Sequence, residues 1–146
     1  MPENQTLQQD PLAAKSPFEL RVKLGENVPE TDVRSALATG DMGFLHSFTT
    51  GSTVDGPGGR VVAWTTGCQW RCSYCHNPDT WNMSNGIPVS IAKATEELSK
   101  YRYGLKIMSG GITVSGGEPL MQHRFVVKLF TAAKKRCYND TSPIRR

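Results

Sequence analysis

Three cysteines follow directly on a stretch of β-branched and aromatic residues, and this placement limits the possible folds more than any other feature. Residues 60–66, RVVAWTT, have the composition of a buried strand. Cys68, Cys72 and Cys75 come next in the spacing C-x3-C-x2-C. In α/β folds with parallel strands, ligands bind at the carboxyl ends of the strands. The sequence therefore predicts a ligand site in the cysteine loop, at the end of a strand.

The spacing of the thiols favours an iron–sulfur cluster over zinc. A [4Fe–4S] cluster is usually held by four cysteines, so three local thiolates leave one iron open to a small molecule. A structural zinc site needs four ligands, commonly two cysteine pairs or one pair with two histidines. Here His76 directly follows Cys75 and there is no second cysteine pair. Zinc is the less favoured alternative.

A disulfide is a weaker alternative still. The N-terminal residues 1–5 lack the basic start and apolar run of a secretory signal, and no segment has the apolar length needed to span a bilayer. We therefore expect a cytoplasmic protein with no membrane contact. In that compartment thiols stay reduced, and clustered cysteines more often bind metal.

Composition indicates a single small domain. The chain has 146 residues, 38% of them hydrophobic, and a net charge of +4. Part of the positive charge lies near the C-terminal end, in Lys134, Lys135, Arg136, Arg145 and Arg146, where a basic run can indicate nucleic-acid binding. No aromatic residues are interleaved there to stack on bases. We interpret the run as a solvated helix end with a polar tail, and expect no nucleic-acid partner.

The remaining elements alternate between helix and strand. Residues 1–29 are predicted to be mostly disordered, with at best an extended stretch at 18–24. Thr31 is predicted to cap a short helix that Gly40 ends, and 51–60 form a turn-rich loop. Further elements are a helix from Ser90 to Tyr101 capped by Gly104, a strand over 110–115, and a helix over 122–135.

This β-α-β-α order predicts an α/β fold with a parallel sheet. Between the second strand and the last helix lies Gly116-Gly117-Glu118-Pro119. Two glycines let a ligand approach the backbone closely, and Glu118 adds an acceptor. Alone, such a loop is more often simply a turn. Because the cysteine loop follows the neighbouring strand, we expect the glycine loop and the cysteine loop to face one shared cavity.

The cysteine spacing followed one strand later by GGEP resembles the radical S-adenosylmethionine enzymes. The likeness is closer to one branch, the pyruvate formate-lyase activating enzymes, which activate glycyl-radical enzymes. It covers about residues 43–136 and is carried by three blocks: STVDGPG at 52–58, YCHNPDTW at 74–81, and SGGITVSGGEPL at 109–120. The resemblance implies the N-terminal part of a partial (β/α) barrel of the radical S-adenosylmethionine type, with parallel strands.

The resemblance also implies a set of site residues. Cys68, Cys72 and Cys75 would hold a [4Fe–4S] cluster whose open iron binds the methionine part of S-adenosylmethionine. One electron from the cluster then cleaves the sulfonium, and the resulting 5′-deoxyadenosyl radical takes a hydrogen from a glycine Cα of the partner. The expected cofactor contacts are Gly116, Gly117 and Glu118 beside the methionine amino group, with Tyr74 and His76 on the adenosyl side.

No side chain is expected to act as a catalytic acid or base, because the cofactors carry the hard chemistry. The implied partners are pyruvate formate-lyase and a flavodoxin- or ferredoxin-type electron donor. Asp55 has two open interpretations, a turn residue that bonds its own backbone or a residue that positions the substrate glycine loop. Trp64 and Trp81 are interpreted as packing residues, and His46 and His123 are given no role.

The chain departs from this family in two places. Gly59 stands where a branched apolar residue is usual, and we expect it to loosen the first strand by roughly 0.5–1 kcal/mol. A full barrel needs roughly 200–250 residues, so we expect a truncated or frame-shifted product. The predicted divisions are 1–42, a largely disordered extension, 43–136, a truncated radical S-adenosylmethionine domain, and 137–146, an atypical polar tail. The alternatives are a non-catalytic iron–sulfur-binding fragment and an activase of another glycyl-radical enzyme.

Overall fold

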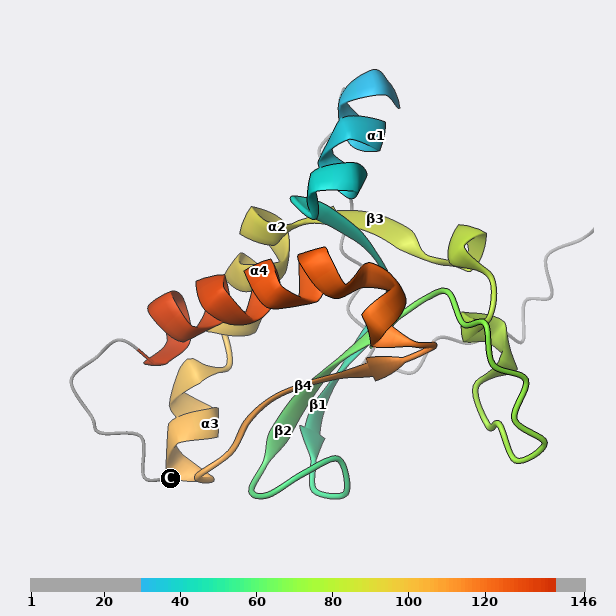
Figure 1. Cartoon of the computed structure of the whole chain (residues 1–146). Coiled ribbons are helices and arrows are strands. Elements are labelled where there is room, and N and C mark those ends of the chain that lie inside the picture. The colour runs from blue at the N-terminus through green and yellow to red at the C-terminus, as the bar shows by residue number, and fades with distance from the viewer. Residues whose placement is uncertain (1–29, 139–146) are drawn as a thin grey trace, which may run out of the picture.

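A four-stranded sheet forms the centre of the molecule (Figure 1). The computed structural model describes residues 30–138. The strands lie in the order β3-β1-β2-β4, and only β2 and β4 are parallel. Their bounds are β1, Met42–Ser52; β2, Arg60–Thr65; β3, Ile87–Ser90; and β4, Gly111–Gly116.

The expected parallel sheet is therefore found only in part. β1 runs antiparallel to both β2 and β3, so the sheet is mixed. The cause is the glycine-rich loop before β2, which folds β1 back onto β2 as a hairpin. Gly56 has φ 141° and Gly58 has φ 72°, conformations that glycine adopts without the steric cost of a side chain. The parallel prediction is correct for β2 and β4, the two strands that precede the predicted ligand loops.

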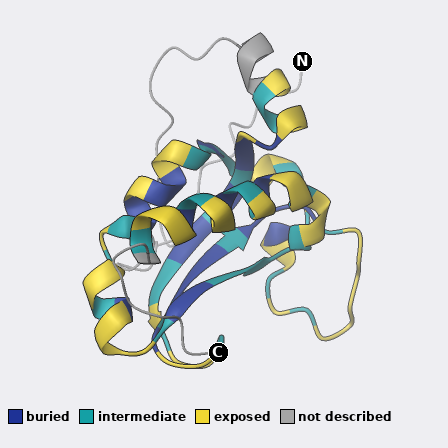
Figure 2. Cartoon of the chain, turned by 60° about the vertical axis from the view of Figure 1, so that its left-hand side comes forward, coloured by how far each residue is buried: buried dark blue, intermediate teal, exposed yellow. Residues whose placement is uncertain are grey.

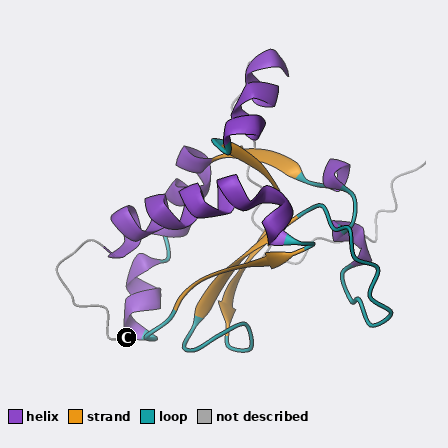
Figure 3. Cartoon of the chain, viewed as in Figure 1, coloured by secondary structure: helices purple, strands orange, loops and turns teal. Residues whose placement is uncertain are grey.

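Within the described part of the chain, four α-helices accompany the sheet (Figure 3). They are α1, Glu30–Thr39; α2, Ile91–Ser99; α3, Arg102–Ile107; and α4, His123–Ala133. Short turns of helix complete the described chain: η1, Pro78–Thr80; η2, Met83–Asn85; η3, Pro119–Gln122; and η4, Lys134–Tyr138. None of the helices within residues 30–138 combines the length and apolar character of a membrane span.

Two predicted helix caps are wrong. Thr31 lies inside α1, which already begins at Glu30. Gly104 lies inside α3, because the chain leaves α2 at Lys100 and starts a second helix at Arg102. Gly40 does end α1, with φ 83°. Ser90 caps α2 as expected, and its hydroxyl accepts a hydrogen bond from the amide of Lys93 at 3.1 Å.

The core lies between the sheet and two helices, α2 and α4, which pack against each other (Figure 2). Phe48 and Val61 come from the sheet, Leu98 from α2, and Phe125 and Leu129 from α4; each is at most 2% exposed. Burial of these large apolar side chains is the main favourable term in folding. The core thereby fixes the carboxyl ends of β2 and β4 relative to each other.

The backbone of Gly59, just before β2, is hydrogen-bonded on both sides, and its predicted loosening of the strand stays a prediction. Its amide donates to the carbonyl of Met108 and its carbonyl accepts from the amide of Gly111, at 3.4 and 3.2 Å. A Cβ atom at this position would lie 2.6 Å from the Met108 side chain, so a branched residue would displace that side chain. The prediction that 1–29 are disordered lies outside the described residues. The predicted domain boundaries stay predictions, although β1 begins at Met42, within one residue of the predicted start.

Candidate iron–sulfur site

Backbone hydrogen bonds close the base of the loop that carries the cysteines. The amide of Gly67 donates to the carbonyl of Thr80 at 2.8 Å, and the amide of Cys68 donates to the carbonyl of Trp81 at 3.0 Å. The outgoing and returning ends of the loop therefore lie side by side just beyond β2. Residues 69–74, in the outer part of the loop, are all exposed (Figure 2).

All three cysteines of this loop are free thiols. Cys68 and Cys75 are half-buried and Cys72 is exposed. A turn brings two of them close in the chain, since the amide of Cys75 donates to the carbonyl of Cys72 at 3.1 Å. Within residues 30–138, no three His, Cys, Asp or Glu side chains are gathered closely enough to hold a metal ion. The donor chemistry fits an iron–sulfur cluster, because one loop supplies three thiols, but the loop must contract to bring them together.

The glycine loop lies directly against the base of the cysteine loop. The amide of Glu118 donates to the carbonyl of Gly67 at 2.8 Å, and the amide of Gly117 donates to the carbonyl of Thr65 at 2.9 Å. A side-chain bond also joins the loops, from the indole Nε1 of Trp70 to Oε2 of Glu118 at 3.2 Å. The two loops therefore lie against each other. That they face one ligand cavity stays a prediction.

The two glycines have a packing reason of their own. A Cβ at Gly116 would lie 2.3 Å from the carbonyl oxygen of Thr65, and one at Gly117 would lie 2.3 Å from that of Gly67. Gly116 also has φ 114°, which side chains rarely adopt. The sequence predicts that a ligand approaches these glycines closely. In the structure, backbone carbonyls of the same chain occupy that position. Whether a cofactor also contacts these glycines stays a prediction.

The other predicted cofactor contacts lie on the exposed surface of the cysteine loop. Tyr74 is 85% exposed, and His76 is exposed as well. Both side chains are available to a ligand or a partner. The structure itself assigns neither of them a role.

Asp55 lies away from the cysteine loop. Its carboxylate accepts a hydrogen bond from the Ser52 hydroxyl, and its carbonyl accepts one from the Thr113 hydroxyl at 2.9 Å. The loop of Asp55 precedes β2 whereas the cysteine loop follows it, so the two leave opposite ends of that strand (Figure 1). These contacts favour the turn interpretation. The substrate-positioning role stays a prediction.

An arginine within the cysteine loop stiffens it. Arg71 Nη1 donates to the carbonyls of Cys68 and Trp70 at 2.6 and 2.8 Å. Its guanidinium lies 4.7 Å from the centroid of the Trp81 ring, a cation–π distance. Trp81 therefore has a more specific role than general packing. Trp64 lies within the sheet, where its Nε1 donates to the Thr49 hydroxyl at 2.8 Å. This position agrees with its prediction as a packing residue.

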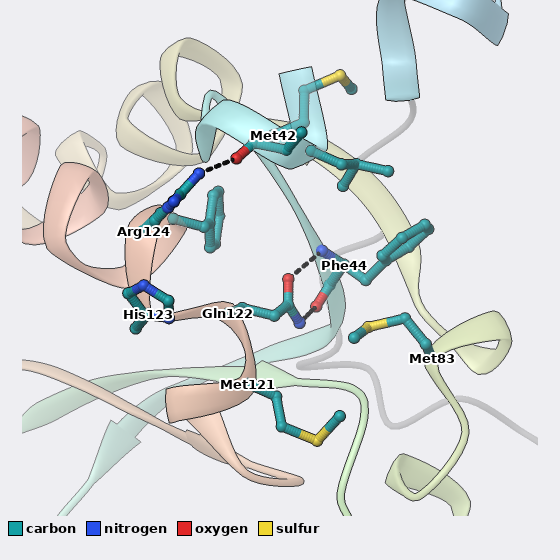
Figure 4. Close-up of a pocket in the computed structure, with 10 residues that line it drawn as sticks. Met42, Phe44, Met83, Met121, Gln122, His123 and Arg124 are labelled. Carbon is teal, nitrogen blue, oxygen red and sulfur yellow. Dashed lines mark hydrogen bonds between the residues drawn. The ribbon is translucent and has the colours of Figure 1, made fainter. Parts of the chain in front are cut away.

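Sequence reasoning missed two residues that hold the site together, His46 and Gln122. His46 Nε2 lies 2.8 Å from Oδ2 of Asp79. The side-chain amide of Gln122 bonds the amide and carbonyl of Phe44 and the carbonyl of Thr66, at 2.7, 2.9 and 2.9 Å (Figure 4). Neither contact has a local sequence signal, because each joins positions more than thirty residues apart.

Gln122 also forms part of a groove of about 310 Å³ beside the cysteine loop. Two of its walls, Met83 and Met121, have methyl groups that a Cβ at Gly67 would approach to 2.7 and 3.8 Å. Figure 4 shows the side chains of these two methionines next to Gln122, with their ends toward each other. The remaining walls come from α1, β1 and the start of α4: Leu37, Ala38, Met42, Phe44, His123, Arg124 and Phe125.

The fourth cysteine lies apart from the other three. Cys137 is in η4 and packs against the hydrophobic core. Desolvation by burial raises the pKa of its thiol, an effect that the positive charges of Arg102 and Arg136 reduce. This position in η4 separates Cys137 from the three thiols of the cysteine loop.

Residues 54–143 match the model of a protein family described as a 4Fe-4S single cluster domain. The chain belongs to this family. The match covers the cysteine loop, the glycine loop and the helices between and after them. Membership of a 4Fe–4S family supports the choice of an iron–sulfur cluster over zinc.

Named relatives of this 4Fe–4S domain agree with the resemblance found in the sequence. Proteins called pyruvate formate-lyase-activating enzyme from Staphylococcus aureus strains USA300, NCTC 8325 and N315 are each 42% identical to it over 116 residues. Each alignment covers 71% of this chain and 46% of the relative. The predicted resemblance to the activating enzymes is thereby confirmed, and the chain spans about half the length of these relatives.

Proposed function

We propose that this protein holds a [4Fe–4S] cluster on Cys68, Cys72 and Cys75 and, as part of a radical S-adenosylmethionine enzyme, activates pyruvate formate-lyase. The observation that carries the proposal is the hydrogen-bonded contact between the cysteine loop and the glycine loop, at the carboxyl ends of two parallel strands. Family membership and the named relatives support the same function. On this proposal the mixed sheet is the first part of a partial (β/α) barrel.

The residues of the chain would divide the work between binding and orientation. The three thiolates bind the cluster, which when loaded supplies one electron for the reductive cleavage of S-adenosylmethionine. Gly116, Gly117 and Glu118 line the methionine side of that cofactor. Two hydrogen bonds orient the Glu118 carboxylate: Oε2 accepts from the indole Nε1 of Trp70, and Oε1 accepts from the amide of Leu120 at 3.0 Å.

The exposed half of the cysteine loop would face the adenosyl group and the partner. Tyr74 and His76 are free to contact the cofactor there, and the surface beyond them is open to a glycine-bearing segment of the partner enzyme. We include Asp55 as a substrate-positioning residue only if the 52–60 loop moves toward the site. The proposed electron donor is a flavodoxin- or ferredoxin-type protein. The proposed compartment is the cytoplasm, where the thiols needed to bind a cluster stay reduced.

Anaerobic reconstitution with iron and sulfide tests the cluster. We expect an oxygen-sensitive [4Fe–4S] centre. Cys72→Ser should lose this centre, and Cys137→Ser should keep it, because Cys137 packs against the core and is not part of the cysteine loop. Iron and sulfide counting with EPR of the reduced protein measures the outcome. Loss of the cluster in Cys137→Ser with retention in Cys72→Ser would contradict the assignment.

The second step tests the activity. Reduced, reconstituted protein is expected to change its EPR spectrum on addition of S-adenosylmethionine, and then to generate a glycyl radical on pyruvate formate-lyase. A second candidate function, a non-catalytic iron–sulfur-binding fragment, is favoured by the coverage of only 46% of the relatives. If the cluster forms but its EPR spectrum does not change on addition of S-adenosylmethionine, the second candidate function is the correct one. A radical formed on a different glycyl-radical enzyme would select an activase of that enzyme.

A further inference from the structure

We propose that His46 and Asp79 form a positioning pair that fixes the returning end of the cysteine loop to the sheet, and so sets how firmly the loop holds its cluster. The inference rests on the proposed function in one respect, that the cysteines hold a cluster. Neither residue belongs to the proposed ligand set. His46 comes from β1, and Asp79 lies in η1, four residues after Cys75.

The first observation is a β-bulge at His46. In the pairing of β1 with β2, Leu45 lies opposite Thr65 and Ser47 lies opposite Trp64. Two steps along β1 thus match one step along β2, and His46 is left out of the ladder. As a result Leu45 and Phe48, three residues apart, both enter the core at 2% and 1% exposure. Bulges of this kind redirect a side chain and are frequent beside active sites.

The redirected side chain reaches the cysteine loop. His46 Nε2 donates to Oδ2 of Asp79 at 2.8 Å, and Nδ1 lies 2.9 Å from the hydroxyl of Ser47. Ser47 is only 8% exposed, so a buried neighbour orients the ring while Nε2 points to Asp79. Both ring nitrogens are therefore occupied, which fixes the rotation of the imidazole.

Asp79 lies directly before the two residues that close the base of the loop, so its contact with His46 also restrains them. Its carbonyl accepts a hydrogen bond from the side chain of Asn85 at 2.7 Å. The next two residues, Thr80 and Trp81, supply the carbonyls that accept from Gly67 and Cys68. A loss of the His46 contact would thus loosen the segment that pairs with the first cysteine. Within residues 30–138, no other side-chain hydrogen bond or ion pair joins β1 to η1.

The cofactor-free protein gives the first test. In His46→Ala we expect the amides of Gly67 and Cys68 to exchange with deuterium about two- to fivefold faster, the range expected for a partly exposed charged pair. His46→Gln retains an N–H donor and is expected to restore slow exchange. Asp41→Asn is the matched control, since Asp41 forms an ion pair with Lys128 at 2.7 Å across other elements. Unchanged exchange in His46→Ala would overturn the proposal.

The cluster gives the second test. In His46→Ala and in Asp79→Ala, the reconstituted cluster should be lost to a chelator about two- to fivefold faster than in the unmodified protein, and its EPR line shape should change. The double variant should lose it no faster than either single variant. Asp79 is 57% exposed, so Asp79→Ala keeps the test available if His46→Ala does not fold.

The outcomes separate the two proposals. If the unmodified protein forms no cluster, the proposed function fails, while the exchange experiment still decides the role of the pair. If the cluster forms and its release and EPR spectrum are the same in both variants, the positioning pair is wrong and the proposed function stands. Additive effects in the double variant would also overturn the pair, because partners in one interaction do not act independently.

Discussion

At the scale of single residues, the four cysteines differ in their surroundings more than in their spacing. Cys72 is exposed on an open loop, whereas Cys137 packs against the core and burial raises the pKa of its thiol. Only the thiolate reacts with alkylating reagents. A raised pKa lowers the thiolate fraction at every pH below it, so the two thiols should react at different rates.

We therefore expect iodoacetamide at neutral pH to modify Cys72 well before Cys137 in the cofactor-free protein. Mass spectrometry of digests taken over time measures the order of labelling. Raising the pH should speed the labelling of Cys137, because the raised pKa is then approached from below. Equal rates in the native protein would contradict the packing of Cys137. A denatured sample, in which all cysteines are exposed, is the control.

His46 shows at the same scale what sequence reasoning cannot reach. The sequence offers no partner pattern for it, and it was given no role. Its partner Asp79 lies 33 positions further on, and only the bulge in β1 directs the two side chains together. The cysteines, by contrast, could be identified at once, because their spacing is local and their chemistry is specific.

At the scale of elements, the glycine loop packs against the backbone of the cysteine loop without room for a side chain. At Gly117, a Cβ would lie 2.3 Å from the carbonyl oxygen of Gly67 and 3.0 Å from that of Thr80. Both atoms are backbone and cannot rotate away. Any side chain at this position must therefore push the two loops apart.

We expect Gly117→Ala to lower the free energy of unfolding by about 1–3 kcal/mol, the usual cost of overpacking. Gly104→Ala is the matched control, because Gly104 lies inside α3 and a Cβ there meets only the Met108 methyl at 3.9 Å. That control should raise stability by about 0.5–1 kcal/mol. Urea melts followed by circular dichroism measure both. If Gly117→Ala left the free energy of unfolding unchanged, the two loops would not be in contact.

The elements themselves could be predicted where their patterns are regular. The strand predicted at 60–66 is β2, the one at 110–115 is β4 within one residue at each end, and the helix over 122–135 contains α4. β1 was missed because the bulge at His46 breaks the alternation that identifies a strand. With β1 missing, the hairpin and hence the antiparallel half of the sheet could not be predicted.

At the scale of the whole molecule, the two edges of the sheet differ. β3 forms one edge; it has four residues and contains Pro88, features that discourage pairing with another chain. β4 forms the other edge, with six residues, GITVSG, and no proline or charge. Among the described strands it pairs only with β2. The β4 edge is therefore the one open to another strand.

Apolar surface lies next to this edge. A groove of about 380 Å³ has an apolar part formed by Ile112 of β4 and by Phe130 and Ala133 of α4, and Phe130 is 43% exposed. The rest of its lining is Arg60, Gly110, Gly111 and Lys134. An unpaired strand with an apolar groove beside it favours self-association. The lean hydrophobic content, 38%, leaves a small core to oppose it, because small domains bury a low share of their surface.

We therefore expect the purified chain to self-associate as its concentration rises, and Phe130→Lys to reduce that association. A lysine at this position places a charge beside β4, where a second copy would have to bury it. Val127→Lys is the matched control, because Val127 is 63% exposed on the same helix but does not line the groove. Sedimentation velocity under reducing conditions measures the association. Equal effects of the two lysines would assign it to general surface charge, and a monomer at every concentration would show that the β4 edge is protected in solution.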